Sequence, residues 1–203
     1  REHRDEPAVT SDGHRVEVVA NLGRADSAEE ALDCGAEGVG LLRTEFLYLD
    51  RADEPSEDEQ YQAYRAIADV MRERPLIIRT LDVGGDKPLP YLDLAEEMNP
   101  FLGVRAVRLS LRRRELFRTQ LRAILRAAED RNVKVMLPLV ATYDEVAQAR
   151  EELDAAEAAL AEEGTPHAQE IELGIMVETP AAALKVEDVA PLVDFLSIGS
   201  NDL

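Results

Sequence analysis

Apolar residues gather in short segments along the chain, and longer amphipathic stretches separate these segments. Six of the short segments are apolar at nearly every position, which predicts strands that are buried on both faces. They cover residues 16–21, 39–43, 76–81, 133–140, 173–178 and 195–199.

The stretches between the strands have apolar residues at helical spacing, which predicts helices over residues 27–34, 56–72, 113–131 and 143–163. The first two of these begin with the spacing of a capping box, Ser27 with Glu30 and Ser56 with Glu59. In a capping box, each of the two side chains binds the backbone N–H of the other residue. We therefore expect these helices to start at the two serines.

The alternation of strand and helix predicts parallel strands joined by right-handed crossovers, either in an open doubly wound sheet or in a (β/α)8 TIM-type barrel. Residues 102–109 fit a strand or the first turns of the following helix. With them the chain has about seven of the eight strands that a barrel needs, so it looks C-terminally incomplete. Residues 1–12 are polar and aperiodic, and we expect a linker there and one domain over 13–203.

The composition indicates a globular protein in an aqueous compartment. The 203 residues are 45% hydrophobic, which supports a core of ordinary size. No apolar run is long enough to span a membrane, and the first residues lack the apolar stretch of a secretory signal, so a cytoplasmic location is expected. The net charge of −19 argues against nucleic acid or an anionic membrane as a partner.

The same acidic excess predicts a halophilic protein. The chain has 42 acidic and 23 basic residues, and only Lys87, Lys134 and Lys185 are lysines. Salt screens the repulsion between surface carboxylates, so thermal melts are expected to show a higher unfolding temperature in molar salt than in dilute buffer. Equal stability in the two buffers would contradict this hypothesis.

Neither the single cysteine nor the histidines point to catalysis. Cys34 lies beside Leu32 in a predicted helix, away from any histidine, and we expect it to be a packing residue. His3, His14 and His167 stand in polar, turn-like settings and are expected to be solvated.

Charged residues follow several of the apolar strands, at the end where the active site of a barrel enzyme lies. These residues are Arg43, Arg79, Glu178 and Asp202. Two arginines can fork onto phosphate and carboxylate oxygens, and two carboxylates offer the oxygen ligands that Mg²⁺ prefers. The alternative is that the four charges pair with one another and stabilise the barrel mouth.

Two further basic residues are candidates for the same site. Lys87 follows the glycine pair Gly84 and Gly85, which permits close backbone approach, and Arg105 follows the Asn99–Pro100 turn. Each fits a substrate contact or a solvated loop side chain equally well.

Five stretches of the chain, in this order, resemble Enzyme I of the bacterial sugar phosphotransferase system. They are residues 35–46, 79–87, 99–105, 174–180 and 197–203. The Asp-Val-Gly-Gly-Asp-Lys sequence at 82–87 favours Enzyme I over its relatives pyruvate phosphate dikinase and phosphoenolpyruvate synthase.

The resemblance implies the phosphoenolpyruvate-binding barrel of a phosphotransferase, which needs Mg²⁺ and usually forms a homodimer. It implies that Arg43 and Arg79 contact the phosphate, that Glu178 and Asp202 bind the metal, and that Asn201 touches the substrate. Arg105 and Lys87 are carried over as further substrate-binding residues.

The chain departs from the family pattern at the reacting groups. In the family, a histidine on a separate N-terminal domain takes the phosphoryl group and passes it to HPr, while a late cysteine protonates the enolate. No residue of this chain matches these groups, and the Thr-Gln-Tyr continuation after Asn-Asp-Leu and a later substrate arginine are missing too. We expect this fragment to bind substrate only weakly and not to complete a turnover.

Two other functions remain open from the sequence. A Mg²⁺-dependent aldolase or lyase that stabilises a pyruvate enolate would also suit the strand that ends at Glu178. The other is a noncatalytic module for dimerisation or regulation.

Overall fold

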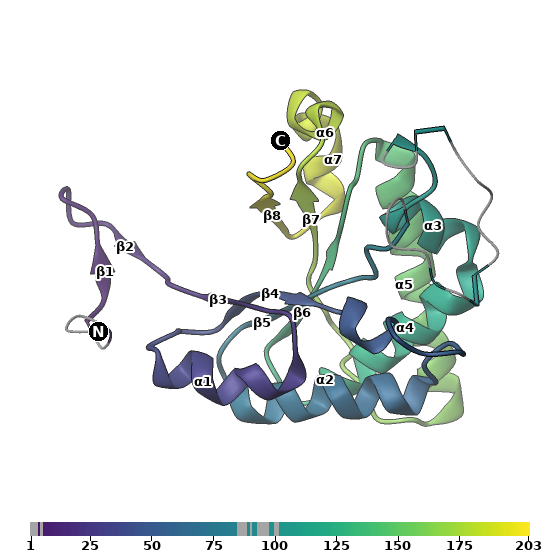
Figure 1. The fold of residues 1–203 in the computed structure, drawn as a ribbon, viewed down its shortest axis with the longest axis horizontal. Coiled ribbons are helices and arrows are strands. Elements are labelled where there is room, and N and C mark those ends of the chain that lie inside the picture. Colours follow the sequence, from purple (N-terminus) through teal and green to yellow (C-terminus); the bar gives the residue numbers. More distant parts are fainter. Residues whose placement is uncertain (1–3, 5, 85–88, 90, 93–97, 100–101) are drawn as a thin grey trace.

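A parallel six-stranded sheet forms the centre of the molecule. The computed structural model describes residues 4, 6–84, 89, 91–92, 98–99 and 102–203. The strands pair in the order of the sequence, each with its neighbour, and the sheet curls as part of a barrel wall does (Figure 1). They are β3 (Ala20–Leu22), β4 (Val39–Arg43), β5 (Leu76–Arg79), β6 (Val133–Leu137), β7 (Leu173–Val177) and β8 (Phe195–Ile198).

Helices connect successive strands, and a small hairpin precedes the sheet. The hairpin pairs β1 (Ala8–Val9) with β2 (Arg15–Val16) and projects away from the rest of the chain (Figure 1). The helices are α1 (Ala28–Asp33), α2 (Glu57–Met71), α3 (Ala106–Arg112), α4 (Arg114–Ala127), α5 (Tyr143–Glu163), α6 (Pro180–Leu184) and α7 (Val186–Val189). Short 3-10 turns lie at η1 (Ala25–Ser27), η2 (Glu45–Leu47) and η4 (Ala190–Leu192).

The two faces of the sheet have different roles, because successive side chains of a strand point to opposite sides. Residues such as Val135 and Ile175 face the helices and join the large core with α2, α4 and α5. The other face holds a small cluster of Leu41, Met136 and Met176. With helices on one face among the described residues, the sheet matches a segment of a barrel wall and not a doubly wound sheet.

Two of the strand predictions are corrected. Residues 102–109 do not form the seventh strand, since residues 102–105 have no strand assignment and α3 begins at Ala106. The predicted strand 16–21 is split, because β2 ends at Val16 and β3 begins at Ala20. The described part of the chain therefore has six strands in the parallel sheet. The hairpin of β1 and β2 spans residue 12, where the sequence predicts the boundary between linker and domain. This domain boundary stays a prediction.

The helix starts distinguish the two predicted capping boxes. Ser56 accepts the Glu59 N–H at 3.2 Å and Glu59 accepts the Ser56 N–H at 2.8 Å, as expected. Ser27 makes no side-chain cap, because it lies in the turn η1 with φ −91° and ψ 0°, where the backbone is already helical. An N-cap side chain needs an extended backbone to turn back onto the helix.

This difference gives a matched pair of substitutions. Ser56→Ala is expected to lower the free energy of unfolding by about 1 kcal/mol, since it removes a cap hydrogen bond. Ser27→Ala is the control and should change it by less than about 0.5 kcal/mol. Urea unfolding of both variants measures the difference, and equal effects would contradict the assignment.

Cys34 and His167 differ from expectation. Cys34 is exposed at the C-terminal end of α1, so it is not a packing residue. His167 is partly buried, with Nδ1 2.7 Å from the Thr165 carbonyl oxygen, whereas His14 is exposed as predicted. His3 lies outside the described residues. No helix among the described residues has the length and apolar character needed to cross a membrane.

Candidate functional site

Two arginines lie side by side at the carboxyl ends of neighbouring strands. Arg43 ends β4, Arg79 ends β5, and the two residues are partners in the parallel register. Partner residues on adjacent strands point to the same face, about 5 Å apart, here the face opposite the helices. Arg43 is exposed, whereas Arg79 is 8% exposed.

Arg79 is held by two carboxylates that the sequence analysis did not single out. Its Nη2 lies 2.5 Å from Glu45 Oε1, and its Nη1 lies 3.2 Å from Asp82 Oδ2. The other Asp82 oxygen accepts a hydrogen bond from Arg105 Nη2 at 2.9 Å. Charged side chains therefore do form ion pairs at this end of the sheet, as the alternative to a binding site predicted. However, Arg79 pairs with Glu45 and Asp82, which are not among the four charged residues predicted to pair with one another.

Glu45 and Asp82 could have been found from their positions. Glu45 follows Arg43 by two residues, and Asp82 follows Arg79 by three, so both stand on the loops that leave the strand ends. Buried arginine requires a nearby carboxylate, and these are the nearest acids in sequence. Gly84 allows Arg105 to lie beside Asp82. It has φ +118°, and an added Cβ there would lie 2.6 Å from the Arg105 Cβ.

Glu178 follows β7 and is 3% exposed. Its Oε1 accepts the Leu139 N–H at 2.7 Å, and Leu139 has the left-handed φ of 54°, which is unusual for leucine. Burial raises the pKa of Glu178 above the usual range of a carboxyl, while the Leu139 N–H and the charge of Arg79 lower it. The nearby carboxylates of Asp82 and Asp202 raise it further.

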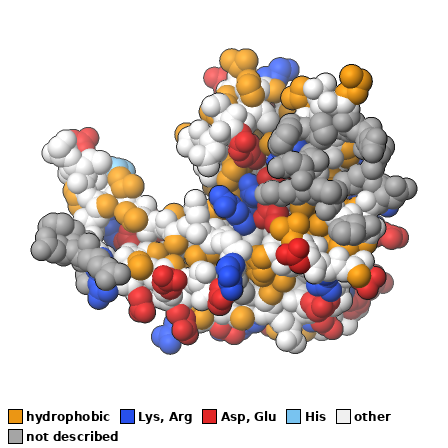
Figure 2. Space-filling model, in the orientation of Figure 1, with side chains coloured by type: hydrophobic (Ala, Val, Ile, Leu, Met, Phe, Trp, Pro, Cys, Tyr) orange, Lys and Arg blue, Asp and Glu red, His pale blue; other side chains and the backbone are white. Residues whose placement is uncertain are grey.

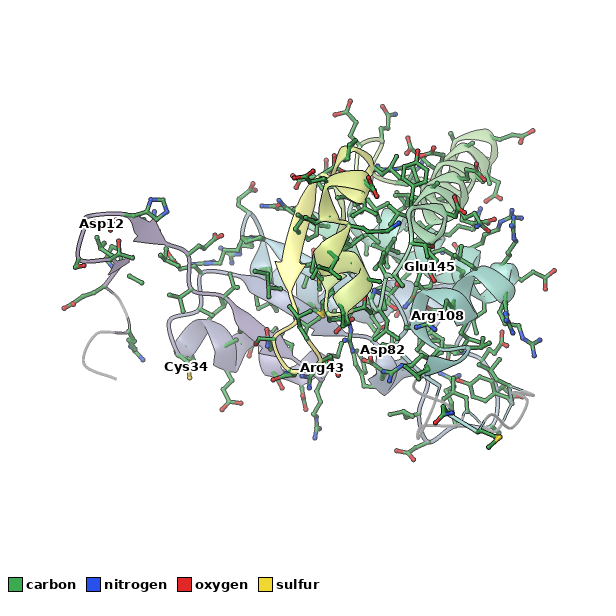
Figure 3. The ribbon with its side chains drawn as sticks, turned by 90° about the horizontal axis from the view of Figure 1, so that it is seen from above. Asp12, Cys34, Arg43, Asp82, Arg108 and Glu145 are labelled. Carbon is green, nitrogen blue, oxygen red and sulfur yellow. The ribbon has the colours of Figure 1, made fainter. Side chains whose placement is uncertain are left out.

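Asn201 and Asp202 follow β8 and line the same cavity as Arg43, Arg79, Arg105 and Glu178. The cavity has a volume of about 690 Å³. Acidic and basic side chains meet in a hollow near the centre of Figure 2, and Figure 3 shows Arg43 near Asp82, with Cys34 well apart from both. The structure thus brings together all the described candidate residues, and Lys87 lies outside the described residues.

Gly199 makes room for Glu178. A Cβ at Gly199 would lie 2.7 Å from Glu178 Cβ and 3.0 Å from Glu178 Oε2, which is too close for either atom to stay in place. The backbone of the β8 end therefore packs directly against this carboxylate.

For the phosphoenolpyruvate ligand and the Mg²⁺ ion that the sequence resemblance implies, Gly199→Ala is expected to displace Glu178 and to weaken binding by about tenfold or more. Gly23→Ala is the matched control, because Gly23 lines the same cavity and has nothing within 4 Å of the added Cβ. Calorimetric titration of both variants measures the effect, and equal dissociation constants would show that Gly199 does not position Glu178.

The carboxylates fit a divalent cation that also binds a ligand. Asp202 is close enough to Glu178 for its charge to raise the pKa of Glu178. No group of three or more acidic, histidine or cysteine side chains forms a metal cage among the described residues. Mg²⁺ is often bound by one or two carboxylates, with substrate oxygens and waters completing its shell, so this pair fits Mg²⁺ shared with a substrate.

The fold and the site place the chain in a known class. The family model for the PEP-binding domain of PEP-utilising enzymes matches residues 1–203, and the chain belongs to this family. Among curated relatives, phosphoenolpyruvate-protein phosphotransferase of Bacillus sp. (strain S) is 53% identical over 198 residues, which are 98% of this chain and 34% of that protein.

Two further relatives have the same name. The phosphoenolpyruvate-protein phosphotransferase of Staphylococcus carnosus (strain TM300) is 52% identical over 200 residues, and that of Bacillus subtilis (strain 168) is 49% identical over 199 residues. Each alignment covers 98% of this chain and 35% of the relative. The chain thus spans about a third of the length of the curated relatives it matches.

Proposed function

We propose that the site binds phosphoenolpyruvate together with Mg²⁺, as the substrate-binding part of an Enzyme I. The observation that supports this most directly is the Arg43–Arg79 pair, which presents two guanidinium groups to one cavity. Arg79 Nε is buried and has no hydrogen-bond partner among the described residues, although Glu45 and Asp82 occupy the other nitrogens. An anionic oxygen of a ligand would satisfy this donor.

Each candidate residue has a role in this proposal. Arg43 and Arg79 bind the phosphate, Asn201, Asp202 and Arg105 contact the substrate, and Lys87 is a further substrate contact. Glu178 and Asp202 would hold Mg²⁺, which would supply positive charge next to the anionic oxygens of the substrate. Because the ion pairs with Glu45 and Asp82 hold the Arg79 guanidinium in place before the substrate arrives, its charge stabilises the transferring group without reorganisation.

In the proposed reaction, the bond between phosphorus and the enol oxygen breaks while a bond from phosphorus to a histidine nitrogen forms. The released enolate takes up a proton and becomes pyruvate. The phosphoryl group then passes to HPr, which starts sugar uptake. The histidine, HPr and a second copy of the chain in a homodimer are the partners that we propose for the whole protein.

Calorimetry with phosphoenolpyruvate and with oxaloacetate, both in the presence of Mg²⁺, tests the substrate. We expect phosphoenolpyruvate to bind and oxaloacetate to bind more weakly. Tight binding of oxaloacetate alone would overturn the proposal in favour of an aldolase or lyase. Sedimentation with and without ligand tests the homodimer, and a single sedimenting monomer under both conditions would exclude it.

A further inference from the structure

A buried amide joins the two arginine-bearing strands behind the site. Gln120 lies on α4 with no exposed surface. Its Oε1 accepts the Leu81 N–H at 2.9 Å, and its Nε2 donates to Thr44 Oγ1 at 3.2 Å. The Thr44 hydroxyl donates in turn to the Arg79 carbonyl oxygen at 3.0 Å. We call Gln120, Thr44 and the Leu81 N–H the Gln120 bridge.

The bridge acts on the residues that adjoin the arginines. Thr44 follows Arg43, and Leu81 lies two residues after Arg79. The last sheet hydrogen bond at the end of β5 runs from the Thr80 N–H to the Met136 carbonyl oxygen. The Leu81 N–H beyond it points to Gln120, so a side chain of α4 replaces the neighbouring strand where β5 leaves the sheet.

A network of buried hydrogen bonds, in which each donor and acceptor is defined, orients the Gln120 amide. Nε2 of Gln120 also donates to the Tyr64 hydroxyl at 3.1 Å, and this hydroxyl donates to Gln60 Oε1 at 3.3 Å. Gln60 Oε1 also accepts from the Tyr48 hydroxyl at 2.8 Å. Burial raises the pKa of both tyrosines, so they remain proton donors. Both hydrogens of the Gln120 amide are thereby assigned, and its oxygen is left for Leu81.

Neither a glutamate nor an apolar side chain could replace Gln120 in this place. A glutamate could accept the Leu81 N–H but, when ionised, could not donate to Thr44, whose hydroxyl would then turn away from the Arg79 carbonyl. An apolar side chain would leave the buried Leu81 N–H without a partner. The amide thus couples the end of β4 to the end of β5 through one rigid group.

We propose that the Gln120 bridge is a positioning device that sets the spacing of Arg43 and Arg79 for the phosphate group of the ligand. This inference rests on the proposed function for the identity of the ligand. A displacement of about 1 Å at a reacting or binding group can cost up to about a hundredfold. The bridge therefore controls ligand affinity without touching the ligand.

The test uses four variants of the 203-residue chain. Thr44→Val removes the hydroxyl at nearly constant shape, Thr44→Ser retains it, and Gln120→Met removes the amide. Tyr48→Phe is the matched control, since the Tyr48 hydroxyl makes a buried hydrogen bond of the same network to Gln60 and not to Gln120, Thr44 or Leu81. Thermal melts and phosphoenolpyruvate titrations with Mg²⁺ are recorded for each variant.

Thr44→Val and Gln120→Met are expected to raise the phosphoenolpyruvate dissociation constant by about tenfold or more. Thr44→Ser should restore it to within about twofold. Tyr48→Phe should lower the melting temperature by a similar amount while leaving the dissociation constant unchanged. If Thr44→Val lowers the melting temperature as Tyr48→Phe does and leaves the affinity intact, the bridge is only structural and the inference is overturned.

A second measurement needs no ligand. The NMR signal of the Arg79 Nε–H is expected to shift or broaden in Thr44→Val and Gln120→Met, and to stay in place in Thr44→Ser and Tyr48→Phe. If the unchanged chain binds no phosphoenolpyruvate, the proposed function fails, and this signal still decides whether the bridge positions Arg79. An identical Arg79 signal in all four variants would overturn the bridge, whatever the ligand.

Discussion

Replacing Arg79 by alanine is expected to abolish detectable phosphoenolpyruvate binding and to destabilise the fold by about 3–5 kcal/mol. Binding fails because water cannot replace a fixed, charged double contact to phosphate. Stability falls because Glu45 and Asp82, with side chains 9% and 10% exposed, lose the cation between them. Calorimetry and urea unfolding measure the two effects separately.

Arg43→Ala is the matched control for this prediction. Arg43 is exposed and makes no ion pair within the described ranges, so its loss should weaken phosphoenolpyruvate binding while changing the free energy of unfolding by less than about 0.5 kcal/mol. Unchanged phosphoenolpyruvate affinity in Arg79→Ala would show that Arg79 is a structural residue. The Arg43–Arg79 pair would then not be a phosphate site.

Removal of Mg²⁺ with a chelator is expected to lower the affinity for phosphoenolpyruvate by about 5- to 150-fold. The charges of the cavity explain why. Three positive side chains face four negative ones, which leaves a net charge of −1; they are Arg43, Arg79 and Arg105 against Glu45, Asp82, Glu178 and Asp202. Phosphoenolpyruvate is triply negative near neutral pH, so it enters a cavity that repels it unless a cation is present.

Titrations in chelator and in millimolar Mg²⁺, at one ionic strength, test this dependence. Linkage requires phosphoenolpyruvate to raise the Mg²⁺ affinity by the same factor, which a reverse titration checks. Equal phosphoenolpyruvate dissociation constants with and without Mg²⁺ would contradict the charge argument. Glu178 and Asp202 would then have no role as metal ligands.

Much of the arrangement could be predicted from local sequence pattern. The helix predicted over 143–163 has the same bounds as α5, and the strand predicted over 39–43 has the same bounds as β4. Apolar strands that end in a charge indicated the edge of the sheet at which the site lies. This inference needs only that parallel strands end on one side, and the structure confirms it for Arg43 and Arg79.

The failures fall where long-range contacts decide the outcome. Residues 102–109 are rich in arginine and fit no single period, and α3 begins only where the backbone of Ala106 binds Val83. The ion pair between Arg79 and Glu45 and the contact between Glu178 and Leu139 join residues 34 and 39 positions apart. No local pattern reports such contacts, although the position of Glu45 and Asp82 beside the strand ends was a usable signal.

The order of the strands also has a consequence for how the chain folds. Because every strand pairs with its predecessor in the sequence, each strand and helix can join the growing sheet as it leaves the ribosome. The two arginines that we propose for phosphate binding are therefore placed early, on β4 and β5, whereas Glu178 and Asp202 follow the later strands β7 and β8. In a growing chain the cavity therefore has three arginines against only two carboxylates, Glu45 and Asp82, until the proposed metal ligands Glu178 and Asp202 join it with β7 and β8.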